Sequence, residues 1–444
     1  MDTKLSLALS AATQTKALEV GDGVLAHAPS IFKEQFGGRP AEIVCDSFTY
    51  GFIGEKIERI FASGGVPLAP AHIFKDARLS TDYRNVCELE EAMRPSDSIA
   101  VAVGAGTVND IVKLASEELG RPYMCVVTAA SVDGYTAYGA SIVKNGVRRT
   151  ENCAAPRAVL CDSSIIKCAP ISLTAAGYAD LAAKIISGAD WILADALGVE
   201  PLDPVAWNIV QDGLKTAISD PAGIRSGNSR VLDSFVEGLM LCGFAMQHYH
   251  SSRPASGSEH LFSHLWDMEG LSFNGKPISH GFSVAVGTLA MSALYEEFLK
   301  YDMSSIDAKS ILKNRPSLES KLSTLDAIFK GRDFLESAKR EVSAKYVSDS
   351  EFARRVETLL SNWESIRERI SAQLVPYGEL RNRLKIVGAP SSPEEIGVSK
   401  KLLRDSFFRA AHIRSRYTLL DLAVELNILD PMLDSIFSGV FADL

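Results

Sequence analysis

The sequence of 444 residues contains no long apolar segment. A helix that spans a membrane needs about 20 consecutive apolar residues, and no window of this chain approaches that length. The segment from Leu5 to Ala12 is too weakly apolar, and too poorly flanked, to indicate a secretion signal. These absences predict a cytoplasmic protein without a membrane span.

An excess of basic charge is also absent. Lys and Arg together number 46 against 55 for Asp and Glu, which gives a net charge of −9. No long basic run occurs, whereas proteins that bind nucleic acid present clustered Lys and Arg. Nucleic acid is therefore not an expected partner.

Cysteine is present, but not in a pattern that binds metal or forms a disulfide framework. The seven cysteines are scattered, odd in number, and include no pair separated by two residues. Cys45, Cys125 and Cys161 lie in or at the end of apolar, strand-like runs. We therefore expect reduced thiols packed in the core.

The N-terminal part of the chain alternates short apolar strands with helices. Strands are predicted at residues 41–45, 99–103 and 124–127, and helices at residues 52–62 and 108–119. This alternation is typical of a parallel sheet covered by helices. With 46% hydrophobic residues, the chain can bury large cores.

The pattern changes at Ala169-Pro170. Ser172 follows as a candidate N-cap for a helix through Leu197, and helical periodicity then continues to the C-terminus. We predict an α/β nucleotide-binding domain with a parallel sheet over residues 1–168 and a mostly α-helical domain over residues 169–444. The long C-terminal helices could bury an apolar face inside the chain or between subunits, so a homo-oligomer is allowed.

Two glycines follow the predicted strand at residues 99–103. Residues 101–110 run from this strand through Gly104 and Gly106 into a helix. Glycine lets the backbone approach a diphosphate, and the N-terminal end of a helix attracts its charge. The third glycine of the dinucleotide fingerprint is missing, so a plain tight turn is the alternative.

Polar residues also follow the other predicted strands. Asp46 could accept a hydrogen bond from a ribose hydroxyl, or it could cap the helical segment that begins near Phe48. The loop at residues 128–137 carries Asp133 among hydroxyl side chains. Ligands of open α/β sheets bind at the carboxyl ends of the strands, where these loops would lie.

Two of the eight histidines, His260 and His264, stand one helical turn apart. Such a pair shares a helix face, so both rings can reach one ion, or one can bind the ion and the other its ligand. Leu261 follows His260, so this is not a metalloprotease signature. With His280 and Asp180, an acid in apolar sequence, the set suits zinc or a similar divalent cation.

Four motifs together resemble the glycerol-1-phosphate dehydrogenases, most closely their bacterial branch. The motifs occupy residues 104–110, 128–136, 175–180 and 252–264, and the similarity resumes at residues 393–397 and 413–422. The resemblance implies a dehydroquinate synthase-like fold, in which the helical domain binds the metal. It also implies an enzyme that interconverts dihydroxyacetone phosphate and sn-glycerol 1-phosphate, using NAD or NADP and one divalent metal, zinc or nickel.

The same resemblance implies a role for each matching residue. The cofactor would be bound by residues that follow the strands: Asp46, Gly104, Ala105, Gly106, Thr107, Val108, Thr128 and Ser131. The metal would be held by Asp180, His260 and His280. Asp133 and His264 would contact the substrate, and Asp180 would lie near its hydroxyl groups.

Three other functions remain open. They are a cyclitol-forming lyase related to dehydroquinate synthase, a glycerol dehydrogenase, and a non-catalytic paralogue that binds nucleotide. The lyases typically have Glu where this chain has Asp180, and an intact set of metal ligands counts against a non-catalytic protein. A divalent ion can polarise the carbonyl group of a ketone, and the dehydrogenase reaction requires this polarisation.

Other conspicuous residues receive less specific interpretations. Lys144, Arg148 and Arg149 could contact the substrate phosphate. Asp190 is expected to be an exposed helix cap or a salt-bridge partner. Ala137 stands where the family often has a serine that contacts the cofactor, which leaves the choice between NAD and NADP open.

Overall fold

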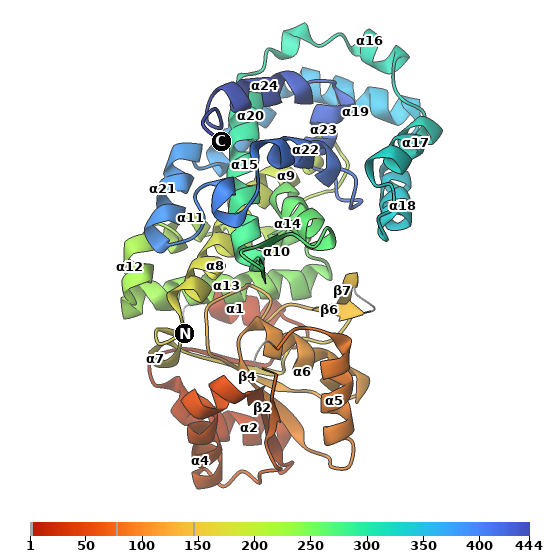
Figure 1. Cartoon of the computed structure of the whole chain (residues 1–444). Coiled ribbons are helices and arrows are strands. Elements are labelled where there is room, and N and C mark those ends of the chain that lie inside the picture. The colour runs from red at the N-terminus through yellow and green to blue at the C-terminus, as the bar shows by residue number, and fades with distance from the viewer. Residues whose placement is uncertain (1–2, 77–78, 145–146) are drawn as a thin grey trace. The chain divides into compact units, whose positions relative to one another are not determined.

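The computed structural model describes residues 3–76, 79–144 and 147–444 (Figure 1). They form two compact units, and each unit is built from two segments of the chain. The first unit contains Met1–Leu181 and Val205–Ser252, and the second contains Ala182–Pro204 and Arg253–Leu444. The sequence predicts a single boundary between residues 168 and 169. In the structure, by contrast, the chain passes between the two units three times.

A six-stranded parallel sheet forms the centre of the first unit. Its strands are β1 (Ala17–Gly21), β2 (Ala41–Asp46), β3 (His72–Phe74), β4 (Ile99–Gly104), β5 (Met124–Val127) and β8 (Ala158–Asp162). Their order is β1-β8-β5-β4-β2-β3, and all neighbours are parallel. Every residue of β4 and β5 is buried, as expected for strands covered on both faces. The predicted parallel sheet is confirmed.

The remaining elements of the first unit are helices and a hairpin. The hairpin pairs β6 (Ala140–Lys144) with β7 (Val147–Glu151). The helices are α1 (Thr3–Ala11), α2 (Ala28–Phe36), α3 (Ser47–Thr49), α4 (Glu55–Ser63), α5 (Tyr83–Met93), α6 (Gly106–Glu118), α7 (Ser163–Ile166), α8 (Ile171–Ala182), α10 (Pro204–Gln211), α11 (Leu214–Ala217), α12 (Pro221–Ser226) and α13 (Ser229–Tyr249). α8 and α10 lie where the chain passes between the units.

Helices cover both faces of this sheet. Figure 1 shows α2 and α4 on one side and α5 and α6 on the other. Phe32 of α2 and Phe61 of α4 pack edge to face, with ring centroids 5.5 Å apart, in a core cluster that includes Val101 and Val103 of β4. α6 packs against β4 and contributes no residue to that cluster.

Two predicted helices differ in detail. The helix expected at residues 52–62 begins only at Glu55, because a π-helical turn over Tyr50–Gly54 precedes it. The helix expected from Ser172 to Leu197 is interrupted at Ala183, which separates α8 from α9. Neither a wide turn nor a one-residue interruption changes the spacing of apolar residues enough to be visible in the sequence.

The second unit is almost entirely helical, which confirms the prediction for the C-terminal part. Its helices are α9 (Lys184–Ala196), α14 (Ser258–Met268), α15 (His280–Lys300), α16 (Ala308–Lys313), α17 (Leu318–Ile328), α18 (Leu335–Lys345), α19 (Asp349–Ser361), α20 (Trp363–Gln373), α21 (Tyr377–Val387), α22 (Lys400–Ala410), α23 (Leu419–Glu425) and α24 (Leu429–Ser438). Two short antiparallel strands, β9 (Ser272–Phe273) and β10 (Lys276–Pro277), lie between α14 and α15.

Helix α15 is the central helix of this unit. It contacts α9, α14, α21 and α24. Of the helices in the described ranges, it alone is long and apolar enough to cross a membrane by length and composition. However, 78% of its most apolar window is buried within the protein, as expected for a core helix.

Candidate metal and nucleotide sites

The predicted diphosphate turn lies where β4 meets α6. β4 ends at Gly104, Ala105 is the extended N-cap residue, and α6 begins at Gly106. A Cβ atom on Gly104 would lie 2.6 Å from Cβ of Val108, so a side chain does not fit there. Ala105 provides no side-chain cap to the first amides of α6. The N-terminus of the helix can therefore accept an anion, with Thr107 and Val108 in its first turn.

The loop over residues 128–137 is fixed next to this turn. The amide of Thr128 donates to the carbonyl oxygen of Gly104 at 3.2 Å. Lys113 of α6 is fully buried. Its ammonium group donates at 3.0, 2.8 and 3.0 Å to the carbonyl oxygens of Gly134, Ala137 and Gly139. Lys113 thus ties the loop to the helix that begins at the diphosphate turn.

Helix α8 places Asp180 beside the same loop. A Cβ atom on Gly177 would lie 2.1 Å from the carbonyl oxygen of Ala130, so the helix contacts the loop backbone directly. One turn further, the buried carboxylate of Asp180 accepts a hydrogen bond from the amide of Asp133 at 3.0 Å. The structure therefore brings together two acids that are 47 residues apart in the sequence.

Ser131 and Asp46 are placed by local hydrogen bonds. Oγ of Ser131 lies 3.1 Å from the hydroxyl of Tyr135. Asp46 caps α3, because its carboxylate accepts from the amide and the hydroxyl of Thr49 at 2.9 and 2.8 Å. The cap interpretation of Asp46 is confirmed. Its position at the end of β2 also leaves it at the carboxyl edge of the sheet.

Helices α14 and α15 of the second unit carry three histidines that lie close together. The ring centroids of His260 and His280 are 5.2 Å apart, and each is 6.2 Å from the ring of His264. The two helices touch at their backbones, since a Cβ atom on Gly287 would lie 2.3 Å from the carbonyl oxygen of Glu259. This contact sets the separation of His260 and His280.

A neighbouring side chain orients each of two imidazoles. Nδ1 of His260 lies 2.7 Å from a carboxylate oxygen of Glu259, and Nδ1 of His280 lies 3.2 Å from the hydroxyl of Ser263. Glu259 is fully buried. Hydrogen bonds at Nδ1 make Nε2 the atom that each ring would offer to a metal, and metal-binding histidines typically have such partners. The sequence did not indicate Glu259 or Ser263 as site residues.

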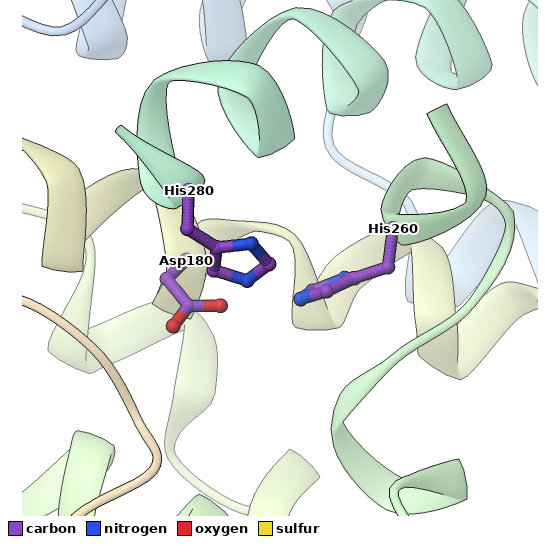
Figure 2. Close-up of side chains that lie close together, drawn as sticks. All are labelled: Asp180, His260 and His280. Atoms are coloured by element: carbon purple, nitrogen blue, oxygen red, sulfur yellow. The ribbon is translucent and has the colours of Figure 1, made fainter. Parts of the chain in front are cut away.

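Asp180, His260 and His280 form a group that could hold a metal ion. Each offers a ligand atom, and these atoms lie within 4.8 Å of one another (Figure 2). Figure 2 shows the carboxylate and the two imidazoles directed toward the same space. One carboxylate and two neutral imidazoles would leave a divalent ion with net positive charge. This donor set fits zinc and similar cations.

His264 has an electrostatic environment that favours the neutral ring. Burial lowers the pKa of His264 well below its usual value, and the positive charge of Arg414 lowers it further. A neutral imidazole can both donate and accept a hydrogen bond. His264 is therefore suited to contact a polar ligand without carrying charge itself.

Asp190 is buried, so the expectation of an exposed residue is wrong. Its carboxylate accepts hydrogen bonds from the hydroxyl of Tyr295 at 2.7 Å and from the amides of Ser258 and Leu419 at 2.6 and 2.9 Å. Burial, together with the charge of Glu259, raises the pKa of Asp190 to about 6. An acidic residue in a helix is normally expected on an exposed face. Because α9 is buried on all sides over most of its length, the burial of Asp190 could not be predicted from the sequence.

The predicted phosphate contacts on the hairpin have other surroundings. Nζ of Lys144 lies 3.8 and 3.5 Å from carboxylates of Glu118 and Glu151 and 4.0 Å above the ring of Tyr83. Its charge is thus already compensated by two acids. Arg149 is exposed, and the side chain of Arg148 lies outside the described residues.

Comparison with known proteins identifies the family to which this chain is similar. The sequence profile of a family described as iron-containing alcohol dehydrogenase matches residues 19–170. Glycerol-1-phosphate dehydrogenase (NAD(P)+) of Halalkalibacterium halodurans is 31% identical over 281 residues, which cover 63% of this chain and 70% of that protein. The protein of the same name from Bacillus velezensis is 29% identical over 388 residues, covering 86% and 84%.

Solved structures share the fold at lower sequence identity. The crystal structure of maleylacetate reductase from a Rhizobium strain superposes with a TM-score of 0.59 and 17% identity, covering 96% of this chain and 97% of that one. This likeness supports the architecture of a parallel sheet followed by helices. Together with the sequence relatives, it leads to one conclusion: the chain belongs to the glycerol-1-phosphate dehydrogenase family.

Proposed function

We propose that this protein is a metal-dependent dehydrogenase that interconverts dihydroxyacetone phosphate and sn-glycerol 1-phosphate with NADH or NADPH. The observation that carries the proposal is the group formed by Asp180, His260 and His280, with ligand atoms within 4.8 Å of one another. Relatives named glycerol-1-phosphate dehydrogenase (NAD(P)+) support the choice of substrate and cofactor.

The nucleotide would bind at the carboxyl edge of the sheet. The first amides of α6 and the turn from Gly104 to Val108 would receive the diphosphate, and Thr128 and Ser131 would continue the site toward the nicotinamide. Asp46 would accept a hydrogen bond from the adenosine ribose. It can do so while it caps α3, because each carboxylate oxygen can accept more than one hydrogen bond. When bound, the nucleotide would supply the hydride.

The metal would be zinc or nickel, held by Asp180, His260 and His280. When bound, a divalent ion acts as a Lewis acid toward the ketone carbonyl and can stabilise developing charge by several kcal/mol. Glu259 and Ser263 would hold the two imidazole rings in the orientation needed for ligation.

Two further residues would contact the substrate. The amide of Asp133 is fixed by its hydrogen bond to Asp180, so the Asp133 side chain starts from a defined backbone position. His264 would donate a hydrogen bond to a substrate oxygen from its neutral ring, since burial and Arg414 disfavour the charged form.

The proposal is tested by the loss of reduced-nicotinamide absorbance with dihydroxyacetone phosphate. Chelator-treated protein is assayed before and after addition of zinc or nickel, with dihydroxyacetone as the control substrate. We expect oxidation only with the phosphorylated ketone, and only after metal is restored. Activity with dihydroxyacetone alone would indicate a glycerol dehydrogenase. No oxidation in any combination would overturn the proposal and favour the lyase or the non-catalytic paralogue.

A further inference from the structure

The buried carboxylate of Asp190 lies between the two helices that carry His260 and His280. Asp190 is on α9, which packs against both α14 and α15. Its Oδ2 accepts a hydrogen bond from the amide of Ser258 in α14 at 2.6 Å, and its Oδ1 accepts from the hydroxyl of Tyr295 in α15 at 2.7 Å. One carboxylate group therefore joins the two helices, with one oxygen for each.

The bond to Ser258 fixes the start of α14. Gly257 is the N-cap residue of this helix and provides no side-chain cap, so Asp190 of another helix accepts from the first turn instead. A Cβ atom on Gly257 would lie 2.6 Å from Oδ2 of Asp190 and 2.8 Å from Oε2 of Glu259. The two acids thus close over the end of the helix, just before His260.

The bond to Tyr295 fixes α15 along its axis. Tyr295 is fully buried and lies about four helical turns beyond His280, which is the first residue of α15. Because a helix is held together by its own backbone hydrogen bonds, a shift of Tyr295 along the axis displaces His280 by a similar distance. Oδ1 of Asp190 also accepts from the amide of Leu419 at 2.9 Å, which ties the start of α23 to the same oxygen.

We propose that Asp190 is a positioning residue for the metal ligands, because it sets the register of the helices that present His260 and His280. This inference rests on the proposed function, since it requires that the two imidazoles bind the ion. The contact of Gly287 with Glu259 sets how closely the two helices approach, whereas Asp190 sets where along their axes the histidines stand. Replacing a residue that supports metal ligands typically costs about ten- to a hundredfold in metal affinity.

Zinc affinity and the visible spectrum of bound cobalt test this role without relying on turnover. The chelator-treated full chain is titrated with zinc against a chromophoric chelator, and with cobalt, whose absorption bands report the geometry of its ligands. Asp190→Asn keeps the size of the side chain and has one carbonyl oxygen, which the donors from Tyr295 and Leu419 would occupy. Its amide nitrogen would then face the amide of Ser258, and the bond to α14 would be lost. Tyr295→Phe breaks the bond to α15 and leaves the bond to α14.

Two control variants in the same unit separate this role from a general loss of stability. Ile370→Val shortens a fully buried side chain of α20, and such a change typically lowers stability. Asp307→Asn removes the charge of an exposed aspartate that caps α16, where asparagine is an equally good cap. The melting temperature of every variant is measured together with its metal affinity.

Asp190→Asn should raise the dissociation constant of zinc about ten- to a hundredfold and shift the cobalt bands. Tyr295→Phe should raise this constant about three- to tenfold, as expected for one lost hydrogen bond to a charged group. The double variant should lose less affinity than the product of the two single losses, because breaking either bond already disconnects the helices. Ile370→Val and Asp307→Asn should keep the zinc affinity and the cobalt spectrum of the wild type.

Three results would overturn the role of Asp190 alone. The first is an unchanged zinc affinity and cobalt spectrum in Asp190→Asn and Tyr295→Phe, and Tyr295→Phe decides by itself if Asp190→Asn does not fold. The second is an equal loss of zinc affinity in Ile370→Val at the same loss of melting temperature, because the effect would then be one of stability. The third is a double variant whose loss equals the product of the single losses, since the two bonds would then act independently.

Failure of this inference can be distinguished from failure of the proposed function. If the wild type binds zinc but reduces no ketone, the proposed function fails, and the metal affinities of the variants still decide the role of Asp190. If the wild type reduces dihydroxyacetone phosphate while the variants bind zinc as tightly as it does, only the role of Asp190 fails. A wild type that binds neither zinc nor cobalt would overturn the role of Asp190 together with the metal site.

Discussion

At the scale of single residues, Lys113 shows how a buried charge can organise a binding loop. All three N–H groups of its ammonium donate to carbonyl oxygens of the loop that follows β5. Lys113→Met keeps the length of the side chain but leaves three carbonyl groups without their donor. We expect the free energy of unfolding to fall by about 2 to 4 kcal/mol and the KM of the nucleotide to rise.

Urea unfolding and steady-state kinetics measure these two effects. Lys56→Met is the matched control, since Lys56 is an exposed lysine on α4 of the same unit. The control should change the free energy of unfolding by less than about 0.5 kcal/mol. Equal stabilities of the two variants would contradict the structural role of Lys113.

His260 and His264 provide a second prediction, because they share a helix face but have different proposed roles. His260→Ala should abolish both metal retention and turnover, whereas His264→Ala should retain the metal and mainly impair use of the substrate. Elemental analysis of the purified variants measures the metal directly. The same metal content in the wild type and in His260→Ala would remove the proposed ligand role of His260.

At the scale of elements, the contact between α14 and α15 controls the spacing of two histidines. Gly287→Ala would place a Cβ atom 2.3 Å from the carbonyl oxygen of Glu259, so the helices must separate. Glycine to alanine within a helix otherwise stabilises it by about 1 kcal/mol. We expect the opposite sign here, a loss of about 1 to 3 kcal/mol, together with weaker metal binding.

Gly378→Ala is the control for this variant. Gly378 lies on α21 of the same unit, and an added Cβ atom would meet nothing within 4 Å. Metal titration and thermal unfolding of both variants separate the steric effect from the gain in helix propensity. If Gly287→Ala binds metal as tightly as Gly378→Ala, the helix contact does not set the geometry of the ligands.

Some strands could be predicted closely from the sequence, whereas some helix ends could not. β2, β4 and β5 agree with the predicted strands to within one residue, because strands buried on both faces are continuous apolar runs. The start of α4 and the interruption at Ala183 were not predicted, since both depend on local backbone geometry rather than on apolar spacing.

The candidate site was predictable only in part. The spacing of His260 and His264, with His280 and Asp180, indicated a metal site. Contacts over long sequence separations gave no comparable signal. Ser263 is 17 residues from its partner His280, and the carbonyl groups that Lys113 contacts are 21 to 26 residues away. Such residues become visible only once the helices and loops are placed.

At the scale of the whole molecule, the discontinuous first unit explains why the single boundary predicted between residues 168 and 169 does not describe the two units. The segment Val205–Ser252 returns to the first unit, where α13 contacts α1 and β1. Its buried Gln247 donates to the hydroxyl of Thr15 at 2.8 Å and to the carbonyl oxygen of Thr136 at 2.6 Å. The first crossing, between Leu181 and Ala182, lies inside α8, so no break in helical periodicity marks it in the sequence.

Metal removal tests the proposed ion against the stability of the whole chain. An ion that binds only the folded protein stabilises it by about 2.7 kcal/mol at a hundred times its dissociation constant. Chelator treatment should therefore lower the melting temperature of the wild type, and zinc or nickel should restore it. His260→Ala, which lacks one ligand, should show little response to chelator or to either ion. If the wild type were equally insensitive, the group of Asp180, His260 and His280 would not bind metal, whereas the ion that restores melting at the lower concentration is the one this ligand set selects.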